Sequence, residues 1–169
     1  MPGTNAPVSD GMIEVRVLNT WVPPVGDDEP ELTVAQWEAG TDITCDLLGD
    51  GLSRSTTENA VTIDRLCMRQ TGEKPGSNSE EVTLTYAWDP QGANVGTAYG
   101  VLTPGSELAL AIRYGIDYGT PGLAGQKTDV IVDIPGVQQR VATARNEETR
   151  VTQKQFVQPG GTYKDVVLT

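Results

Sequence analysis

The 169-residue chain contains no histidine, one phenylalanine and two cysteines, and its 12 basic residues are outnumbered by 23 acidic ones. Without histidine it lacks the usual general base near neutral pH, and it cannot build the Ser/His/Asp or Cys/His arrangements of nucleophilic enzymes. It also lacks the commonest ligand of zinc. We therefore expect no catalytic residues, and we expect that the protein is not an enzyme.

The two cysteines, Cys45 and Cys67, are too few for a disulfide framework and lack the spacing of a zinc site. Cys45 shares a predicted strand face with Ile43 and Leu47, which favours a buried free thiol. No stretch approaches the roughly 20 apolar residues of a membrane span, and the N-terminus lacks the features of a secretion signal. We expect no membrane insertion by this chain, and synthesis in a cytoplasm.

Basic residues are scarcest in the first third of the chain. Residues 1–53 hold ten acids and one base, a net charge of −9, whereas the whole chain carries −11. Proteins that grip nucleic acid need a basic surface, because their affinity comes from neutralising phosphates and releasing counterions. The composition therefore disfavours conventional nucleic-acid binding.

Two segments have features of ligand sites, and each has a simpler interpretation. Residues 119–128, GTPGLAGQKT, lack the adjacent Gly-Lys-[Ser/Thr] of a phosphate-binding loop and are predicted to be a strand connection. The four acids of residues 27–31 could hold a hard cation such as calcium, but they lack the spacing of an EF-hand. A run of acids is usually a solvated loop, so we expect no metal and no cofactor.

The three tryptophans allow a different class of function. Trp21, Trp37 and Trp88 could form a platform for a sugar, but they stand in three unrelated local settings. Trp88 also shares a strand face with Leu84 and Tyr86, so core packing is the favoured interpretation.

Turn formers and alternating patterns predict a mainly β fold. The 19 glycines and 11 prolines of the chain favour many short strands with frequent turns. Residues 1–11 are polar and predicted to be a flexible N-terminal arm, followed by a single β-rich domain over residues 12–169. Thr33 and Gln36 form a capping-box pattern that predicts one short helix over Val34–Ala39.

Strands are expected wherever apolar and polar residues alternate. Residues 21–31 and 71–81 are predicted to be exposed loops, and residues 49–59 a polar turn between two strands. The predicted strands cover residues 12–18, 41–48, 60–68, 82–88, 108–114, 129–134, 137–142, 150–158 and 163–168.

Two charged features follow from these patterns. Arg113 lies among alanines on one strand face, so it is either one partner of a salt bridge at a subunit interface or an exposed cation. Asp129 and Asp133 project from one face of a strand whose other face is apolar. On this pattern alone, that face is expected to meet outside solvent.

The segment 82–120, VTLTYAWDPQGANVGTAYGVLTPGSELALAIRYGIDYGT, carries a family resemblance. A strand ending in aromatic-Asp-Pro, a Gly/Ala/Tyr link and a strand closing in Arg-Tyr-Gly are similar to the core of the major tail tube proteins of long-tailed, siphovirus-type bacteriophages, especially those of actinobacterial hosts. Residues 32–44, LTVAQWEAGTDIT, resemble the short helix and Gly-Thr-Asp-Ile-Thr of the same family.

The resemblance implies a fold, an assembly and partners. It implies an antiparallel β-sandwich or small barrel with one short flanking helix and long assembly loops. It further implies hexameric rings of this chain, stacked into a hollow tail tube of the virion that conducts DNA without binding it tightly. The partners it implies are the tape measure protein, the tail terminator and the distal tail proteins.

On this basis the charged residues acquire expected roles. Asp129 and Asp133 are expected to face the lumen, where carboxylates repel phosphates, and Arg113 is the candidate interface cation. The candidate residues for contacts between subunits or rings lie in the two predicted loops: Asp27, Asp28, Glu29, Glu31, Glu73, Lys74, Glu80 and Glu81. Two alternatives stay open: another virion β-protein, such as a decoration or tail-completion subunit, and a monomeric acidic β-sandwich that binds carbohydrate.

Overall fold

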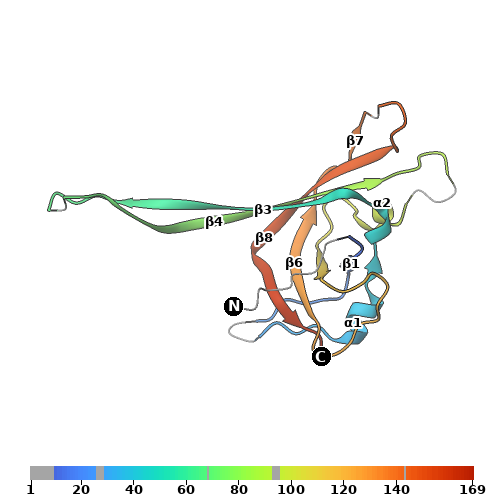
Figure 1. Ribbon diagram of the computed structural model, residues 1–169, viewed down its shortest axis with the longest axis horizontal. Helices are drawn as coiled ribbons and strands as arrows, with labels where there is room; N and C mark the ends of the chain where they lie inside the picture. The colour runs from blue at the N-terminus through green and yellow to red at the C-terminus, as the bar shows by residue number, and fades with distance from the viewer. Residues whose placement is uncertain (1–9, 26–28, 68, 93–95, 143) are drawn as a thin grey trace, which may run out of the picture.

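The computed structural model describes residues 10–25, 29–67, 69–92, 96–142 and 144–169. The chain forms a rounded β body from which one two-stranded arm extends far to one side (Figure 1). The body contains two short α-helices, α1 (Val34–Ala39) and α2 (Thr97–Val101), and a 3₁₀ turn, η1 (Thr44–Asp46). No helix in the described ranges is long and apolar enough to cross a membrane.

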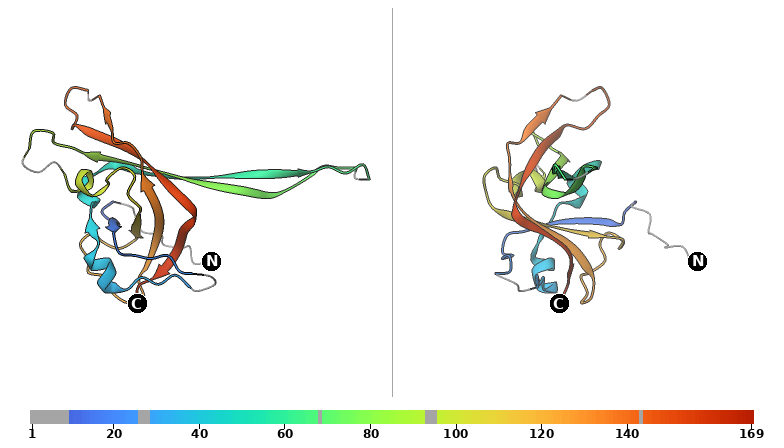
Figure 2. Two further views of the ribbon diagram at one scale, coloured as in Figure 1. Left: turned by 180° about the vertical axis from the view of Figure 1, so that it is seen from behind. Right: turned by 90° about the vertical axis from the view of Figure 1, so that its left-hand side faces the viewer.

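Eight antiparallel strands form one sheet in the order β2-β1-β5-β6-β8-β4-β3, and β7 also pairs with β8. The prediction of a mainly antiparallel β fold is confirmed, and the strands belong to one continuous sheet that curves around its own core (Figure 2). Their bounds are β1 Ile13–Leu18, β2 Thr41–Asp42, β3 Leu47–Ile63, β4 Gly72–Ala87, β5 Leu108–Tyr114, β6 Lys127–Pro135, β7 Gln139–Val141 and β8 Arg150–Val167.

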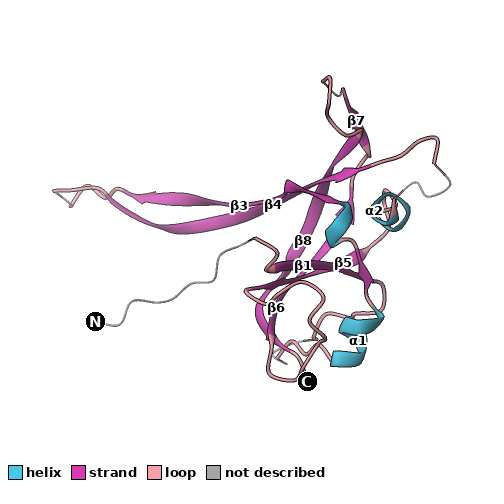
Figure 3. Cartoon of the chain, turned by 45° about the vertical axis from the view of Figure 1, so that its right-hand side comes forward, coloured by secondary structure: helices cyan, strands magenta, loops and turns pink. Residues whose placement is uncertain are grey.

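Apolar clusters lie on both faces of the central strands. In β5, Leu110 and Ile112 join the cluster enclosed by the curved sheet, whereas Ala109 and Ala111 join a second cluster that contains Trp37. The alanines are small, so helix α1 lies close to the outer face of the sheet (Figure 3). Both faces of β5 and β6 are therefore buried, as is typical of strands in the middle of a fold.

The predicted helix over Val34–Ala39 and its capping box are confirmed. The Gln36 amide donates to Thr33 Oγ1 at 3.1 Å, and the Thr33 amide donates to Gln36 Oε1 at 3.0 Å. This reciprocal capping box satisfies two backbone donors at the start of the helix. The predictions of strands β1, β5 and β6 are also confirmed, with bounds that agree to within a few residues.

The two strands of the arm contradict the sequence prediction. Residues 49–59 and 71–81 were predicted to be a turn and a protruding loop, but they belong to β3 and β4, which pair from Leu47 with Tyr86 to Ile63 with Gly72. Most side chains of this ribbon are exposed on both faces. Apolar and polar residues alternate in a strand when one of its faces is buried. Both faces of this ribbon are exposed to solvent, so its sequence lacks that alternation.

Three smaller predictions were also wrong. Cys45 lies in η1 and is exposed, because the chain turns there instead of continuing as a strand. The two strands expected at the C-terminus form a single strand, β8, and helix α2 interrupts the Gly/Ala/Tyr link.

Trp21 and Trp37 are buried in one apolar cluster and Trp88 packs against the other, so in the described residues the three rings form no exposed platform. Trp37 is fully buried and Trp21 is buried with its Nε1 donating to the Glu31 carbonyl at 2.9 Å. Trp88 stacks on Tyr99 at 5.6 Å between ring centroids, beneath the guanidinium of Arg140. The packing interpretation of these rings is therefore the one that the structure supports.

Candidate functional site

The arm is the feature of this subunit that packing within the chain explains least. Strand β4 pairs with β8 only between Val82 and Ala87, and in the described ranges β3 pairs only with β4. Outside that stretch, both long edges of the ribbon leave backbone donors and acceptors unpaired by any other strand. An isolated two-stranded ribbon is marginally stable in water, so an arm of this length is suited to contact another chain.

A group of charged side chains fixes the base of the arm to the body. Arg54 of β3 forms ion pairs with Glu80 of β4 and, at 2.5 Å, with Asp129 of β6. The second oxygen of Glu80 accepts from Thr162 Oγ1 of β8 at 2.6 Å. The other oxygen of Asp129 accepts from the Asp165 amide at 3.1 Å. We call Arg54, Glu80, Asp129 and Thr162 the arm anchor.

Arg54, the central cation of the anchor, stays charged over the whole physiological pH range. Partial burial lowers the pKa of Arg54, but its hydrogen bonds to Asp129 and Glu80 outweigh that effect and raise the pKa above its ordinary value. The three charged side chains are each less than a fifth exposed. Water therefore screens these ion pairs less than it screens a pair on the open surface.

The structure separates the predicted loop residues into different settings. Glu73 and Lys74 are exposed near the far end of the arm, and Glu29 is exposed on the body. Glu80 belongs to the arm anchor, and Glu81 forms an exposed ion pair with Lys154 of β8 at 2.9 Å. Glu31 is exposed, whereas Asp27 and Asp28 lie outside the described residues. The role of these residues in contacts between subunits stays a prediction.

The two candidate lumen acids lie in different environments. Asp129 is partly buried and its charge is balanced by Arg54. Asp133 has no exposed surface, because the face of β6 that carries it turns into the core beside Ile131 and Leu108. The prediction that Asp133 lines a channel is therefore wrong for this subunit, since a side chain enclosed by its own chain presents no charge to a lumen. For Asp129 it stays a prediction.

Asp133 is an unusual buried carboxyl. Among the described residues neither of its oxygens has a hydrogen-bond partner, and the side-chain amide of Gln155, on the neighbouring strand β8, is likewise buried without one. Burial raises the pKa of Asp133 to about 8, because a low-dielectric environment disfavours the charged form. At neutral pH most of the folded molecules therefore carry this carboxyl in its protonated form.

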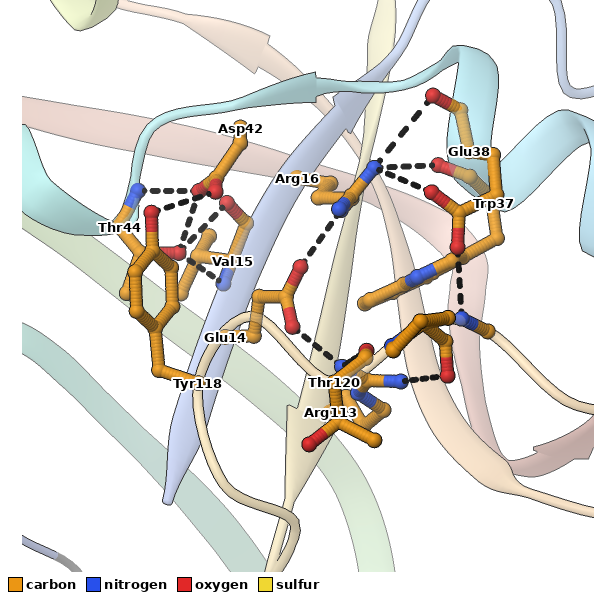
Figure 4. A network of polar contacts seen from close by, with 12 residues as sticks. Glu14, Val15, Arg16, Trp37, Glu38, Asp42, Thr44, Arg113, Tyr118 and Thr120 are labelled. Carbon is orange, nitrogen blue, oxygen red and sulfur yellow. Dashed lines mark hydrogen bonds and ion pairs between the residues drawn. The ribbon is translucent and has the colours of Figure 1, made fainter. Parts of the chain in front are cut away.

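Arg113 is buried inside the subunit, which corrects both expectations for it. Its guanidinium forms an ion pair with Glu14 of β1, and both side chains have no exposed surface (Figure 4). It also donates to Gln126 Oε1 at 2.8 Å. The other oxygen of Glu14 pairs with Arg16 at 2.7 Å.

Trp37 of helix α1 lies between the two guanidinium groups of this network. The ring centroid is 4.9 Å from the Cζ of Arg113 and 5.1 Å from that of Arg16. Cations over an indole face are attracted to its π electrons. Gly122 packs at the edge of the same ring, where a Cβ would lie 2.7 Å from Trp37 Cδ1. The network thus fastens α1 and the loop after β5 to the sheet.

Arg54 and Glu14 were not predicted as site residues, although Arg54 is the partner of Asp129 and Glu14 is the partner of Arg113. Arg54 was placed in a turn, and Glu14 in a strand with one wet face. Their partners are far away in sequence, 75 positions for Arg54 and Asp129 and 99 positions for Glu14 and Arg113. In the described residues no group of three or more Cys, Asp or Glu side chains is placed to hold a metal ion.

Comparison with known proteins gives this architecture a family. The family model described as "Phage tail tube protein" matches residues 1–169. The chain belongs to the phage tail tube protein family. The comparison with curated proteins gave no match.

One solved structure similar to this tail tube family member is the sheath/tube terminator of an extracellular contractile injection system, PVC, determined by cryo-EM in the extended state. The TM-score is 0.58 and the identity 12%, and the match covers 95% of this chain and 98% of the other. At that identity the likeness shows the fold alone. Family membership supports a structural component of the phage tail.

The buried ion pair gives a first prediction. Replacing Arg113 by Ala leaves the buried Glu14 carboxylate with Arg16 alone, and we expect the free energy of unfolding to fall by about 3–5 kcal/mol. Urea denaturation measures the change. Lys154→Ala, which removes an exposed ion pair, is the matched control and should change stability by less than about 1 kcal/mol. Equal effects of the two variants would contradict the structural role of Arg113.

The buried acid gives a second prediction. An unfolded chain releases the Asp133 proton with a pKa of about 3.9, whereas the folded chain holds it up to about 8. Between these values the folded state binds one more proton, so this carboxyl lowers the free energy of unfolding by about 1.4 kcal/mol for each rising pH unit. Asp133→Asn should remove that contribution.

The measurement is urea denaturation between pH 5 and pH 8. The difference in stability between Asp133→Asn and the natural chain should grow steadily in favour of the variant as pH rises. Asp50→Asn, which changes an exposed carboxyl, should give a curve parallel to that of the natural chain. A parallel curve for Asp133→Asn would show that this carboxyl titrates normally.

Proposed function

We propose that this subunit self-assembles into stacked hexameric rings that form the hollow tail tube of a long-tailed phage of siphovirus type, with an actinobacterial host. The tube conducts DNA into the host cell. The subunit is made in the bacterial cytoplasm and functions in the virion, where its partners are further copies of itself, the tape measure protein, the tail terminator and the distal tail proteins. Membership of the tail tube family supports this proposal.

The observation that carries the proposal is the anchored arm. Residues beyond Thr57 in β3 and before Ser79 in β4 pair only with each other within the described ranges. An exposed ribbon with two free edges is a hazard for a protein that stays monomeric, because such edges pair with other chains. The arm anchor fixes the direction in which this ribbon leaves the body. A ribbon that is fixed at its base and uncovered along its edges is suited to reach a neighbouring subunit.

The charge of the chain supports passage of DNA without tight binding. The net charge of −11 repels phosphates, and a tube built from many such subunits multiplies that repulsion. Since Asp133 is buried and Asp129 is paired, the acids that face the lumen are to be sought among the exposed carboxylates. Glu29 and Glu31 on the body are such residues.

A second candidate is a tail-completion role, in which the subunit caps a tube instead of building it. The similarity of the fold to a sheath/tube terminator favours it. The two roles differ in polymerisation, since a tube subunit continues to add rings and a terminator stops at one. A monomeric carbohydrate-binding module has less support, because Trp21 and Trp37 are buried and Trp88 stacks on Tyr99.

Shortening the arm tests the proposal. Thr57 and Ser79 face each other in the ladder, so residues 58–78 can be replaced by an Asn-Gly turn. The anchor and both apolar clusters remain, so we expect the body to fold with a melting temperature within a few degrees of the natural one. Tube formation, followed by negative-stain microscopy and sedimentation of concentrated protein, should be lost.

A point variant at the arm anchor should impair tube formation less severely than the shortened arm. Arg54→Ala keeps the arm but releases its base from Asp129, so we expect fewer and shorter tubes at equal concentration. Arg145→Ala, which removes an exposed arginine of the loop before β8, is the control and should leave tubes unchanged. Tubes of normal length from the shortened chain would contradict the proposal, and single rings that never stack in the natural chain would favour the tail-completion role.

A further inference from the structure

The tip of the arm carries an apolar side chain with no cover. Leu66 lies in the connection between β3 and β4 and is fully exposed, at 109% of the reference area. Arg65 and Arg69 lie on either side of it in the sequence and are exposed as well. A single exposed leucine is ordinary on a protein surface. At the end of an anchored arm, however, an exposed leucine flanked by two arginines is suited to contact another protein surface.

The body carries an open apolar pocket at the root of the same arm. It has a volume of about 430 Å³, and Ile13, Val15, Leu47, Leu48 and Leu52 line most of it. Tyr118 forms one wall and is held there by donating its hydroxyl hydrogen to Asp42 Oδ2 at 2.9 Å.

A chain cannot fill this pocket with its own tip. Leu52 lines the pocket, whereas Ile63 ends the strand that leads to the tip. The strand between them spans about 35 Å at about 3.3 Å per residue. The arm runs away from the body in Figure 1 and in the left view of Figure 2. The tip therefore meets this pocket only on another copy of the chain.

Charge favours the same pairing. All pocket residues except Tyr118 belong to the first 53 residues, which carry a net charge of −9. Asp10 lines the pocket, and the exposed Asp50 adjoins Gly49, which also lines it. The connection at the tip, residues 64–71, carries Arg65 and Arg69 against Asp64, a net charge of +1. Opposite charges around an apolar centre steer two surfaces together and fix their orientation.

We propose that the Leu66 tip of one subunit inserts into the pocket lined by Leu48 and Leu52 of a neighbouring subunit. Each copy offers one tip and one pocket, on different parts of its surface. Such a contact is heterologous, so it propagates from copy to copy into a closed ring or an open helix. The inference rests on the proposed self-assembly and adds which surfaces meet.

The two native cysteines report on this contact. Cys45 lines the pocket and Cys67 follows Leu66 at the tip, and both are exposed free thiols. If the tip enters the pocket, Cys67 of one copy comes near Cys45 of the next. Mild oxidation, or a short bismaleimide where the thiols do not reach the roughly 4–7 Å Cα separation of a disulfide, should then join assembled subunits into a ladder of covalent oligomers on a denaturing gel.

Two single variants make the test specific. Cys45→Ser alone and Cys67→Ser alone should give no cross-link, and their mixture should give dimers and no larger species. Dimers from either variant alone would show that like thiols meet, which overturns the proposal. A maleimide reagent should label Cys45 rapidly in the unassembled subunit and at least tenfold more slowly after assembly. Protection of Cys45 before assembly would show that the pocket is filled from within the chain, and would also overturn it.

Leu66→Asp removes the apolar contact without touching the core. We expect the protein concentration needed for assembly to rise about tenfold or more, with an unchanged melting temperature. Val137→Asp changes an equally aliphatic, 74% exposed side chain on the body, and should assemble normally.

The outcomes separate this proposal from the proposed function. Tubes without the cross-linked ladder would refute the tip contact and leave the tube function standing. A ladder without tubes would support the contact and refute the tube function. Absence of both would contradict the two together.

Discussion

The ion pairs of Arg54 with Glu80 and Asp129 determine what the arm can do. They join β3, β4 and β6 at the point where the ribbon leaves the sheet, and Thr162 of β8 completes the group. The β4 ladder on β8, the ion pair of Glu81 with Lys154 and the packing of Leu52 on the core also join the ribbon to the body. Partial burial strengthens the pairs of Arg54, because less water screens them. An arm with a fixed direction loses less conformational entropy when it binds than a loop that must first become ordered.

The interior uses buried charge in two contrasting ways. Glu14 and Arg113 pair within the core, and both carboxylate oxygens of Glu14 have a guanidinium partner. Asp133 has no partner for either oxygen, and burial raises its pKa to about 8. The first arrangement fastens helix α1 and its tryptophan to the sheet. The second makes the stability of the fold depend on pH near neutrality, since ionisation of Asp133 costs free energy that no contact offsets.

Sequence reasoning succeeded where the signal is local and failed where it is not. The two residues of the capping box of helix α1, Thr33 and Gln36, lie within one turn of each other. The apolar alternation of β5 extends over its seven residues. The arm was missed because its strands are held by backbone pairing with each other, which leaves no apolar pattern. Asp133 was misplaced because both faces of β6 are buried, so alternation does not tell which face meets water. The family, in contrast, followed from the motif in residues 82–120 and is confirmed by the match over the whole chain.

The central claim is that the arm of each subunit lies against a neighbouring subunit in the assembled tail. A cryo-EM reconstruction of tubes formed by the full chain tests it most directly, because the path of β3 and β4 from the arm anchor to Leu66 can be followed in the density. The account predicts that the arm leaves the body in the direction seen in the isolated subunit and ends against the next copy. Arms that project freely from the tube, with both edges and the tip in solvent, would contradict it.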